Sequence, residues 1–289
     1  KKGLCSSQNW FDRPSEECEV SCVHTSLLRP APYYALWYPG PLAKEFKPEE
    51  EQPRYQHNVQ RFSLRTRGLD LRYSDVMMSS ICKSLTNDFV GISMYSPKYQ
   101  HKAERLLRSC SRVGVCCKAR LLPANAFGDD APEGSDNYRY ETIASKPSFI
   151  LGELEATQLP VVFLDVDLEF HKFPELFLPD SWPEGSRDVA LFNFWANETN
   201  VTYRHTPNIG SAVAFFNHTY RAKKLLTAWA EAMKYKTNDR APDDQVLDKL
   251  LNEGGWQKRV SLGWLPAAYL RTMPAYYRGI DPVIDHDRG

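Results

Sequence analysis

The sequence predicts an α/β protein with a mostly parallel central sheet flanked by helices, and three observations support this fold class. From Asn87 onward, short apolar runs that suit strands alternate with helix-forming segments. These apolar runs are near-continuous, as in strands buried on both faces. The first 86 residues are instead rich in proline and charge and show no sustained period. We therefore predict an irregular N-terminal extension over 1–86, packed on the body, and a single Rossmann-like domain over 87–289.

The expected elements follow one another in a regular order along this domain. Strands are predicted at 89–96 and 113–122, at the apolar run within 159–170, and at 188–195 and 210–217. Helices are predicted at 98–110, 140–157, 218–236 and 242–252, with a polar loop at 125–137. We expect the second helix to break at Pro147, because proline cannot donate the hydrogen bond of a helix interior.

Composition and charge exclude several classes of protein. With 289 residues, of which 42% are hydrophobic, the chain can bury a large core, so it is globular rather than disordered. Its 36 basic and 36 acidic residues cancel, which leaves no overall field to attract nucleic acid or an anionic membrane. We expect no nucleic-acid partner and no membrane contact within this sequence, and any charged ligand must be held locally.

Cysteines and glycosylation triplets indicate the compartment. None of the seven cysteines has the paired C-x-x-C spacing of a zinc site, and disulfides of undefined pairing are compatible with their positions. Asn197, Asn200 and Asn217 each begin an N-x-T triplet, which favours passage through a secretory lumen. We expect a Golgi protein whose type II membrane anchor precedes the sequence given.

Two aspartates close the most apolar short run of the chain. In "LPVVFLDVDLEF" (159–170), Asp165 and Asp167 are two residues apart. Side chains at i and i+2 of a strand share a face, and ligands of open α/β sheets bind beyond the carboxyl ends of strands. Paired oxygen donors there suit Mn²⁺ or Mg²⁺, with positions left for phosphate oxygens. The alternative interpretation is that one aspartate caps the next turn and the other is solvated.

Further polar residues follow in order along the chain. Asn208 and Gly210 precede a buried strand, where glycine permits close approach of a ligand and asparagine can bind hydroxyls. Asp243, Asp244 and Gln245 lie in the first turn of a predicted helix. A simple turn explains the first pair equally well, and the helix dipole alone favours acidic residues in a first turn.

Together, these features resemble the nucleotide-diphospho-sugar transferases of the GT-A fold, particularly their retaining, metal-dependent branches. The resemblance rests on the apolar strand, the D-x-D and N-x-G motifs, the helix carrying Trp229, the D-D-Q motif and a late histidine, over Asn87 to Gly289. It implies that His286 joins Asp165 and Asp167 as a metal ligand. The chain lacks the family's H-x-x-G-x-x-K-P tail, which places this third ligand in question.

The resemblance also assigns residues to the sugar nucleotide. Lys146, on the helix before the metal-binding strand, corresponds to a lysine that contacts the donor, and Arg139 is a weaker candidate for the same place. The first strand of the family meets the base and ribose, and here it ends at Tyr95, whose ring can stack. Structural alternatives are an exposed helix lysine and a core tyrosine.

The function implied is Mn²⁺-dependent transfer of a sugar from a nucleotide-diphosphate donor, with UDP the expected carrier, to a hydroxyl of a glycan or glycoprotein. The metal and Lys146 would stabilise the departing diphosphate. In the retaining mechanism, which the resemblance favours, Asp243, Asp244 and Gln245 bind donor sugar or acceptor hydroxyls. In an inverting mechanism, Asp243 or Asp244 would be the general base.

Two other functions compete with this interpretation. Haloacid-dehalogenase-like phosphotransferases also end an apolar strand with D-x-D and use Mg²⁺. They carry Thr or Val at the position of Glu169, however, and their motif opens the fold, whereas a strand–helix–strand pattern precedes it here. The second is a non-catalytic carbohydrate-binding protein on the same fold, since fold does not guarantee activity.

Overall fold

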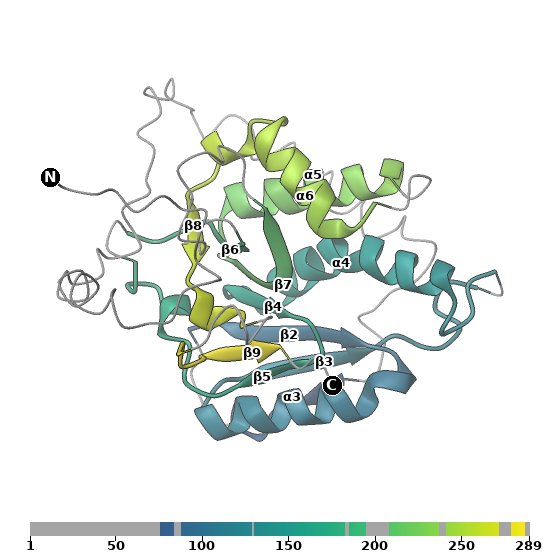
Figure 1. Ribbon diagram of the computed structural model, residues 1–289, viewed down its shortest axis with the longest axis horizontal. Coiled ribbons are helices and arrows are strands. Elements are labelled where there is room, and N and C mark those ends of the chain that lie inside the picture. The colour runs from purple at the N-terminus through teal and green to yellow at the C-terminus, as the bar shows by residue number, and fades with distance from the viewer. Residues whose placement is uncertain are drawn as a thin grey trace, which may run out of the picture. The chain divides into compact units, whose positions relative to one another are not determined.

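A central sheet of seven strands organises the described part of the chain (Figure 1). The computed structural model describes residues 76–83, 88–128, 130–182, 185–194, 208–236, 241–271 and 279–286. The strand order is β1-β3-β2-β4-β7-β6-β8. The strands are β1 (Val76–Met78), β2 (Val90–Tyr95), β3 (Cys117–Leu121), β4 (Val161–Leu164), β6 (Val189–Asn193), β7 (Ile209–Phe216) and β8 (Leu262–Leu265).

The predicted α/β class with a mostly parallel sheet is confirmed. Strands β3, β2, β4, β6 and β8 run in one direction, while β1 and β7 run the opposite way. A small antiparallel sheet pairs β5 (Leu168–Phe170) with β9 (Ile284–His286). The helices are α3 (Gln100–Val113), α4 (Asp136–Thr157), α5 (Tyr220–Lys236) and α6 (Asp243–Asn252).

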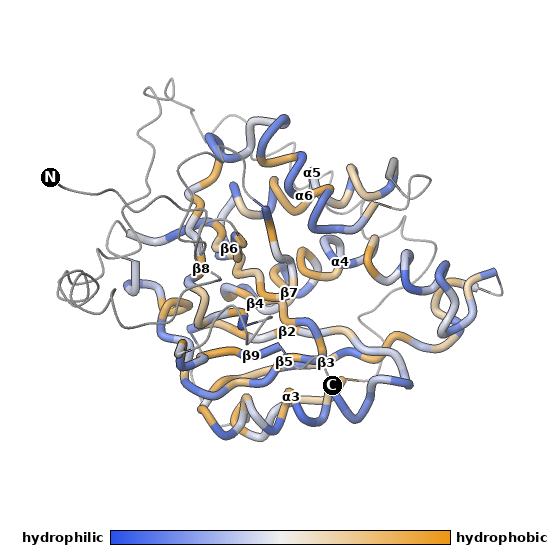
Figure 2. The backbone as a smooth tube through the Cα atoms, viewed as in Figure 1, coloured by the Kyte–Doolittle hydropathy of each residue, from blue (hydrophilic) through white to orange (hydrophobic). Residues whose placement is uncertain are grey.

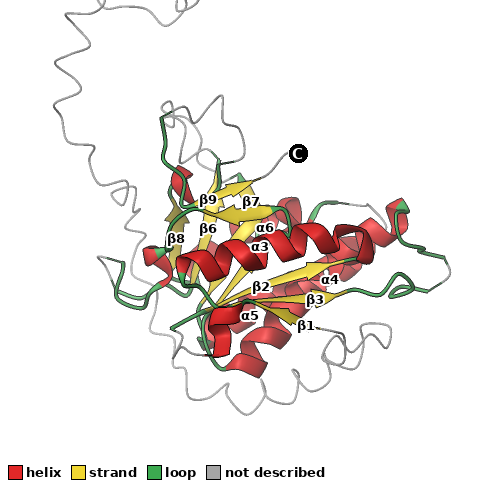
Figure 3. Cartoon of the chain, turned by 90° about the horizontal axis from the view of Figure 1, so that it is seen from below, coloured by secondary structure: helices red, strands yellow, loops and turns green. Residues whose placement is uncertain are grey.

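Helices cover both faces of the central sheet (Figure 3). Along β4, Val161 and Phe163 pack into the core formed with α4, α5 and α6, whereas Val162 and Leu164 pack into the core formed with α3. All four side chains are at most 3% exposed. Apolar residues accordingly follow the central strands in Figure 2. Burial on both faces explains why this strand reads as a continuous apolar run rather than an alternating one.

The connections of the central strands define where a ligand can bind. The β2–α3–β3 connection passes over one face of the sheet, and the β3–α4–β4 connection passes over the other. As a result, β3 and β4 lie on either side of β2, so the strand order reverses there. In open α/β sheets, ligands bind beyond the carboxyl ends of the strands at such a switch point.

Helix α4 corrects one expectation, because it continues through Pro147 without the predicted break. Buried residues on both sides of the proline, Tyr138 and Ile150 among them, fix the two halves against the core, so packing outweighs the missing hydrogen bond. The helix also begins inside the predicted loop, where the Ser135 hydroxyl accepts a hydrogen bond from the Tyr138 backbone N–H at 3.1 Å. No helix within the described ranges is both long and apolar enough to cross a membrane.

Several short strands were not predicted. β1 lies inside the segment 1–86, for which the sequence indicated irregular structure, and it pairs antiparallel with β3 at the sheet edge. β8, β5 and β9 are three or four residues long, too short to show a period that sequence analysis could detect. Residues 1–75 lie outside the described part of the chain, so the boundary and packing of the extension stay predictions.

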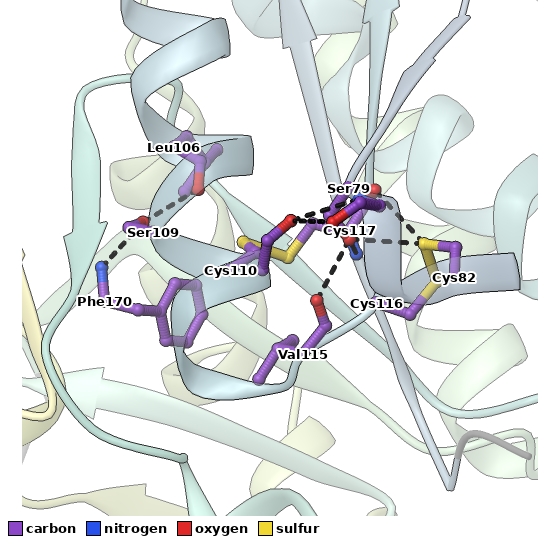
Figure 4. The surroundings of a disulfide bond; sticks show 11 residues. Ser79, Cys82, Leu106, Ser109, Cys110, Val115, Cys116, Cys117 and Phe170 are labelled. Atoms are coloured by element: carbon purple, nitrogen blue, oxygen red, sulfur yellow. Dashed lines mark hydrogen bonds between the residues drawn. A yellow bond between two sulfur atoms is a disulfide. The ribbon is translucent and has the colours of Figure 1, made fainter. Parts of the chain in front are cut away.

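Two disulfides tie neighbouring elements to β3 (Figure 4). Cys82, after β1, bonds to Cys116, and Cys110 of α3 bonds to Cys117, with Cα atoms 4.6 and 6.2 Å apart. Gly91 of β2 leaves room for the second bridge, because a Cβ there would stand 2.6 Å from the Cys117 sulfur. The remaining cysteines, Cys5, Cys18 and Cys22, lie outside the described residues.

Candidate active site

The D-x-D motif lies at the carboxyl end of β4, the strand that pairs with β2. β4 ends at Leu164, and the Asp165 backbone N–H still donates to the Ala212 carbonyl of β7 at 2.8 Å. A turn follows, in which Leu168 N donates to Asp165 O at 3.2 Å, and β5 begins. A tight turn rather than a continuous strand therefore places Asp165 and Asp167 together. This turn was not predicted, because Leu168 and Phe170 prolong the apolar pattern of the strand.

The first half of the site, which we call the inner cluster, consists of Lys146, Asp165, Ser211 and Asp243. The Lys146 ammonium lies 2.8 Å from Asp243 Oδ2 and 3.4 Å from Asp165 Oδ1, and it donates to Ser211 Oγ at 3.2 Å. It also stands 4.7 Å from the centre of the Phe163 ring. Lys146 is only 6% exposed. Residues from α4, β4, β7 and α6 thus meet around one buried cation.

Charge and burial oppose each other in this cluster. Burial disfavours a charged lysine, but Asp165 and Asp243 outweigh it and raise the pKa of Lys146 above its ordinary value. Burial raises the pKa of Asp165, against the attraction of Lys146, and repulsion from Asp243 and Asp167 raises it further. A divalent cation would relieve this excess of negative charge near Asp165.

The start of α6 fixes the D-D-Q residues. The buried Trp229 of α5 donates its indole N–H to the Asp243 carbonyl at 3.1 Å, which anchors the first turn of α6 beside Lys146. Asp244 is partly buried, and burial together with Asp243 raises its pKa. Gln245 is exposed, and its backbone N–H donates to Asp244 Oδ1 at 2.7 Å. Only Asp243 of the three belongs to the inner cluster.

The second half of the site, the outer cluster, consists of Asp167, His286 and Lys102. His286 Nε2 is 3.4 Å from Asp167 Oδ1, and Lys102 Nζ is 3.8 Å from Asp167 Oδ2. The side chains are 21–28% exposed. β9 brings His286 here by pairing opposite Leu168, the residue after Asp167. The C-terminal histidine thus reaches the motif across more than a hundred residues of sequence.

An arginine–carboxylate pair holds β9 in place. Arg271 donates Nε to Asp285 Oδ1 at 3.1 Å and a second hydrogen bond from Nη2 to Asp285 Oδ2. The backbone N–H of Arg271 donates to Ile284 O, and that of His286 donates to Arg271 O. His171 Nε2 lies 3.8 Å from Asp285 Oδ2. The residue next to His286 is therefore fixed by a two-pronged interaction.

The side chains at this edge fit a divalent cation in chemistry. Asp165, Asp167 and His286 offer carboxylate oxygens and an imidazole, a set that suits Mn²⁺. The buried Nδ1 of His286 has no hydrogen-bond partner in the described residues, so this imidazole is not committed to a structural role on that side. Across the described ranges, no three acidic, histidine or cysteine side chains already stand close enough together to enclose a metal. Binding would require side-chain rotation.

The N-x-G residues lie at the start of β7, on the same edge of the sheet. Asn193 Oδ1 accepts from the Asn208 backbone N–H and Asp248 Oδ1 from the Ile209 N–H, both at 3.1 Å. Burial raises the pKa of Asp248 to about 6. A Cβ on Gly210 would meet the Phe194 ring at 3.0 Å, so this glycine makes room for a side chain of the protein itself.

Two residues expected to meet the donor lie elsewhere. Tyr95 is 5% exposed and belongs to the core on the α3 side, so its ring has no free face for a base. The exposed aromatic residue after β2 is Tyr99, at 41%. Arg139 is exposed in the first turns of α4, and no hydrogen bond or ion pair between its side chain and either cluster occurs among the described residues.

Three residues of the site were not predicted from the sequence: Lys102, Ser211 and Asp248. Lys102 belongs to no motif. Its position shortly after the first predicted strand is the one sequence signal that could have marked it as a site residue. Ser211 directly follows Gly210 and could have been found as an extension of N-x-G. Asp248 lies one helical turn after Asp244, a spacing that places both side chains on one face of α6.

The chain is similar in structure to solved glycosyltransferases. One is involved in glycosylation of the major capsid of PBCV-1, with 15% identity, 70% of this chain and 96% of that chain covered, and a TM-score of 0.46. The galactosyltransferase LgtC is 11% identical, the match covers 69% of this chain and 87% of that chain, and the TM-score is 0.42. Mouse xyloside xylosyltransferase 1 is 14% identical, the match covers 70% of this chain and 98% of that chain, and the TM-score is 0.42.

These similarities concern the fold. No protein-family model matches the sequence, and no curated protein matches it significantly. At TM-scores below 0.5, the similarities by themselves assign neither family nor activity. The function has to be inferred from the residues of the chain.

Proposed function

We propose that the chain is a glycosyltransferase that uses a nucleotide-diphosphate sugar and a divalent cation, with Mn²⁺ the expected one. One observation supports this proposal most strongly: three side chains that can bind a cation lie close together beside the buried Lys146, at the switch point of the sheet. They are Asp165, Asp167 and His286. Carboxylates and imidazole would hold the cation. Bound there, the cation would supply Lewis-acid stabilisation of the departing diphosphate.

The donor nucleotide would bind at the carboxyl end of β2. Tyr99 exposes its ring there, and we assign to it the stacking role that the sequence predicted for Tyr95. Lys98 and Lys102 lie 5.8 and 5.9 Å from the ring centre, so the surroundings of this aromatic are cationic and suit a nucleotide phosphate. UDP remains the carrier we propose.

The inner cluster takes Asp243, one of the two carboxylates that could act as general base in an inverting reaction, out of that role, and we keep retention as part of the proposal. A general base needs a carboxylate that reaches the acceptor hydroxyl, but Asp243 is 5% exposed and lies 2.8 Å from the Lys146 ammonium. Asp243 therefore serves to hold Lys146, whose charge would stabilise the leaving diphosphate. In a retaining reaction, the departing phosphate accepts the acceptor proton, and no such base is required.

The acceptor would bind on the α6 side of the site. Asp244, Gln245 and Asp248 line the accessible face of this helix, and Asn208 lies at the adjoining start of β7. Carboxylate and amide side chains suit the hydroxyl groups of a sugar. We propose a glycan or glycoprotein acceptor.

The disulfides support a secretory compartment. Four cysteines in the described part of the chain form two bridges, which persist in oxidising compartments and are rare in the cytosol. This agrees with the three glycosylation triplets. A place in the Golgi lumen is consistent with a glycoprotein acceptor, and we keep it as part of the proposal.

The proposal is tested by turnover of the donor. The purified protein is incubated with UDP- and GDP-linked xylose, galactose, glucose and N-acetylglucosamine, with Mn²⁺ or with EDTA, and the released nucleoside diphosphate is measured. We expect Mn²⁺-dependent release from one donor and a loss of at least about 100-fold in Asp167→Asn. Glu169→Gln is the matched control, because Glu169 pairs with Arg112 and lies outside both clusters.

The competing functions give different results in the same assays. A phosphotransferase would leave every sugar nucleotide intact and hydrolyse a phosphate ester such as p-nitrophenyl phosphate with Mg²⁺. A carbohydrate-binding protein would turn over neither. Either outcome would contradict the proposed transferase.

A further inference from the structure

Each aspartate of the D-x-D motif contacts a different lysine, and the two lysines come from opposite faces of the sheet. Lys146 of α4 contacts Asp165, with 3.4 Å between Nζ and Oδ1. Lys102 of α3 contacts Asp167, with 3.8 Å between Nζ and Oδ2. Each of the two aspartates proposed to hold the cation therefore already faces an ammonium group.

The two lysines differ in how firmly they are held. Lys146 is 6% exposed and surrounded by Asp165, Ser211, Asp243 and the Phe163 ring. The Lys102 side chain is 21% exposed, and its distance to Asp167 exceeds that of a hydrogen bond. Partly exposed ion pairs of this kind contribute little to stability, so Lys102 can leave Asp167 at small cost.

Lys102 also lies beside the place proposed above for the nucleotide. It belongs to the first turn of α3, which follows β2 after a short 3-10 helix, Pro97–Tyr99. Its ammonium group stands 5.9 Å from the exposed Tyr99 ring. Asp167 and the Tyr99 ring are both near the ammonium group of one flexible side chain.

We propose that Lys102 exchanges partners during donor binding: it neutralises Asp167 in the free protein and binds the donor diphosphate once a divalent cation has taken its place. This inference rests on the proposed function. A lysine suits such an exchange because its ammonium is a compact charge on a flexible stem that adapts to either anion.

The exchange couples the binding of cation and nucleotide. A cation that binds alone must displace Lys102 and leaves the ammonium without an anion, whereas a diphosphate supplies that anion. Each ligand therefore raises the affinity for the other, and the factor is the same in both directions. Without the Lys102 ammonium, the cation binds more tightly alone, and the nucleotide binds less tightly beside the cation.

The test measures both ligands on the full chain. Mn²⁺ binding is followed by electron paramagnetic resonance of the free ion, with and without UDP, and UDP binding by calorimetry at saturating Mn²⁺. In Lys102→Met we expect Mn²⁺ alone to bind about 3- to 10-fold more tightly, and UDP about 5- to 10-fold less tightly, than in the wild type. Lys102→Arg keeps the charge and should preserve most of the coupling.

Lys98→Met is the matched control. Lys98 lies 5.8 Å from the same Tyr99 ring, but its ammonium makes no ion pair within the described ranges. The Mn²⁺ affinity of this variant should equal that of the wild type.

Unchanged or weaker Mn²⁺ binding in Lys102→Met, or unchanged UDP binding, would overturn the inference. A wild-type protein that binds no nucleotide with Mn²⁺ would instead contradict the proposed function, and tighter binding of Mn²⁺ alone to Lys102→Met would still support the competition step.

Discussion

The inner and outer clusters hold the same D-x-D motif by different means. The inner cluster places Asp165 beside a lysine that is 6% exposed and has three polar partners and an aromatic ring. The outer cluster places Asp167 beside Lys102 and His286, at distances of 3.8 and 3.4 Å and with side chains 21–28% exposed. One aspartate contacts a buried lysine, and the other contacts partners that are themselves partly exposed.

This difference assigns separate tasks to the two clusters. A buried charge that loses its partner is costly, so the inner cluster must stay assembled for the fold to persist. Contacts in the outer cluster are weaker and can be exchanged for a ligand without unfolding the protein. We infer that the inner cluster provides a fixed charge pattern and that the outer cluster responds to cation and nucleotide.

The largest effect is expected where the inner cluster is broken. Lys146→Met leaves Asp243, 5% exposed, without its cation, and should lower the free energy of unfolding by about 3 kcal/mol as well as abolish UDP binding. Chemical denaturation and calorimetry measure the two effects. Lys223→Met is the control, since Lys223 pairs with Glu155 at 3.1 Å between α5 and α4, away from the site. Equal losses of stability in both variants would contradict the special role of the inner cluster.

A smaller effect is expected where the support of the outer cluster is removed. Arg271→Ala frees Asp285 and loosens β9, so His286 is less well positioned, and Mn²⁺ affinity should fall by about 10-fold. Lys172→Ala, which breaks the exposed pair with Asp281, should leave it unchanged. Mn²⁺ titration of both variants separates positioning of the histidine from a general effect of a lost ion pair. Wild-type affinity in Arg271→Ala would show that β9 holds His286 without this pair.

The smallest effect concerns Asp248, whose pKa burial raises to about 6. The folded protein binds this proton more tightly than the unfolded chain, so ionisation destabilises the fold as pH rises from about 4 to about 6, and the penalty is fully present above pH 6. Asp248→Asn keeps an acceptor for the Ile209 N–H and removes the charge. Its melting temperature should exceed that of the wild type by about 2 °C at pH 7.5 and by less at pH 4.5. A constant difference across this range would contradict the shifted pKa.

The sequence could predict elements whose packing shows in their composition. β2, β4, β6 and β7 are buried along almost their whole length, so their apolar runs stand out from the surrounding polar segments. The three-residue strands β5 and β9 have no such signal, because pairing between distant segments creates them. Pro147 gave a local signal for a helix break that the structure does not show, because tertiary packing of α4 outweighs the low helix propensity of proline.

The candidate site was only partly accessible from sequence, for a related reason. Asp165, Lys146 and Asp243 could be selected by motif order, and the structure brings all three together. Tyr95 and Tyr99 cannot be told apart without knowing where β2 ends, because one ring enters the core and the other faces solvent. Lys102 can be recognised as a site residue only once the fold places α3 beside the D-x-D turn.

The central claim is that this edge of the sheet binds a nucleotide diphosphate through a cation held by Asp167. Its most direct test is calorimetric titration of the protein with UDP and GDP, in Mn²⁺ and in EDTA, repeated on Asp167→Ala and on the exposed-carboxylate control Asp281→Ala. We predict binding of one nucleotide that requires Mn²⁺, disappears in Asp167→Ala and persists in Asp281→Ala. Absence of binding by the folded wild-type protein with Mn²⁺ present, or full binding by Asp167→Ala, would contradict the claim.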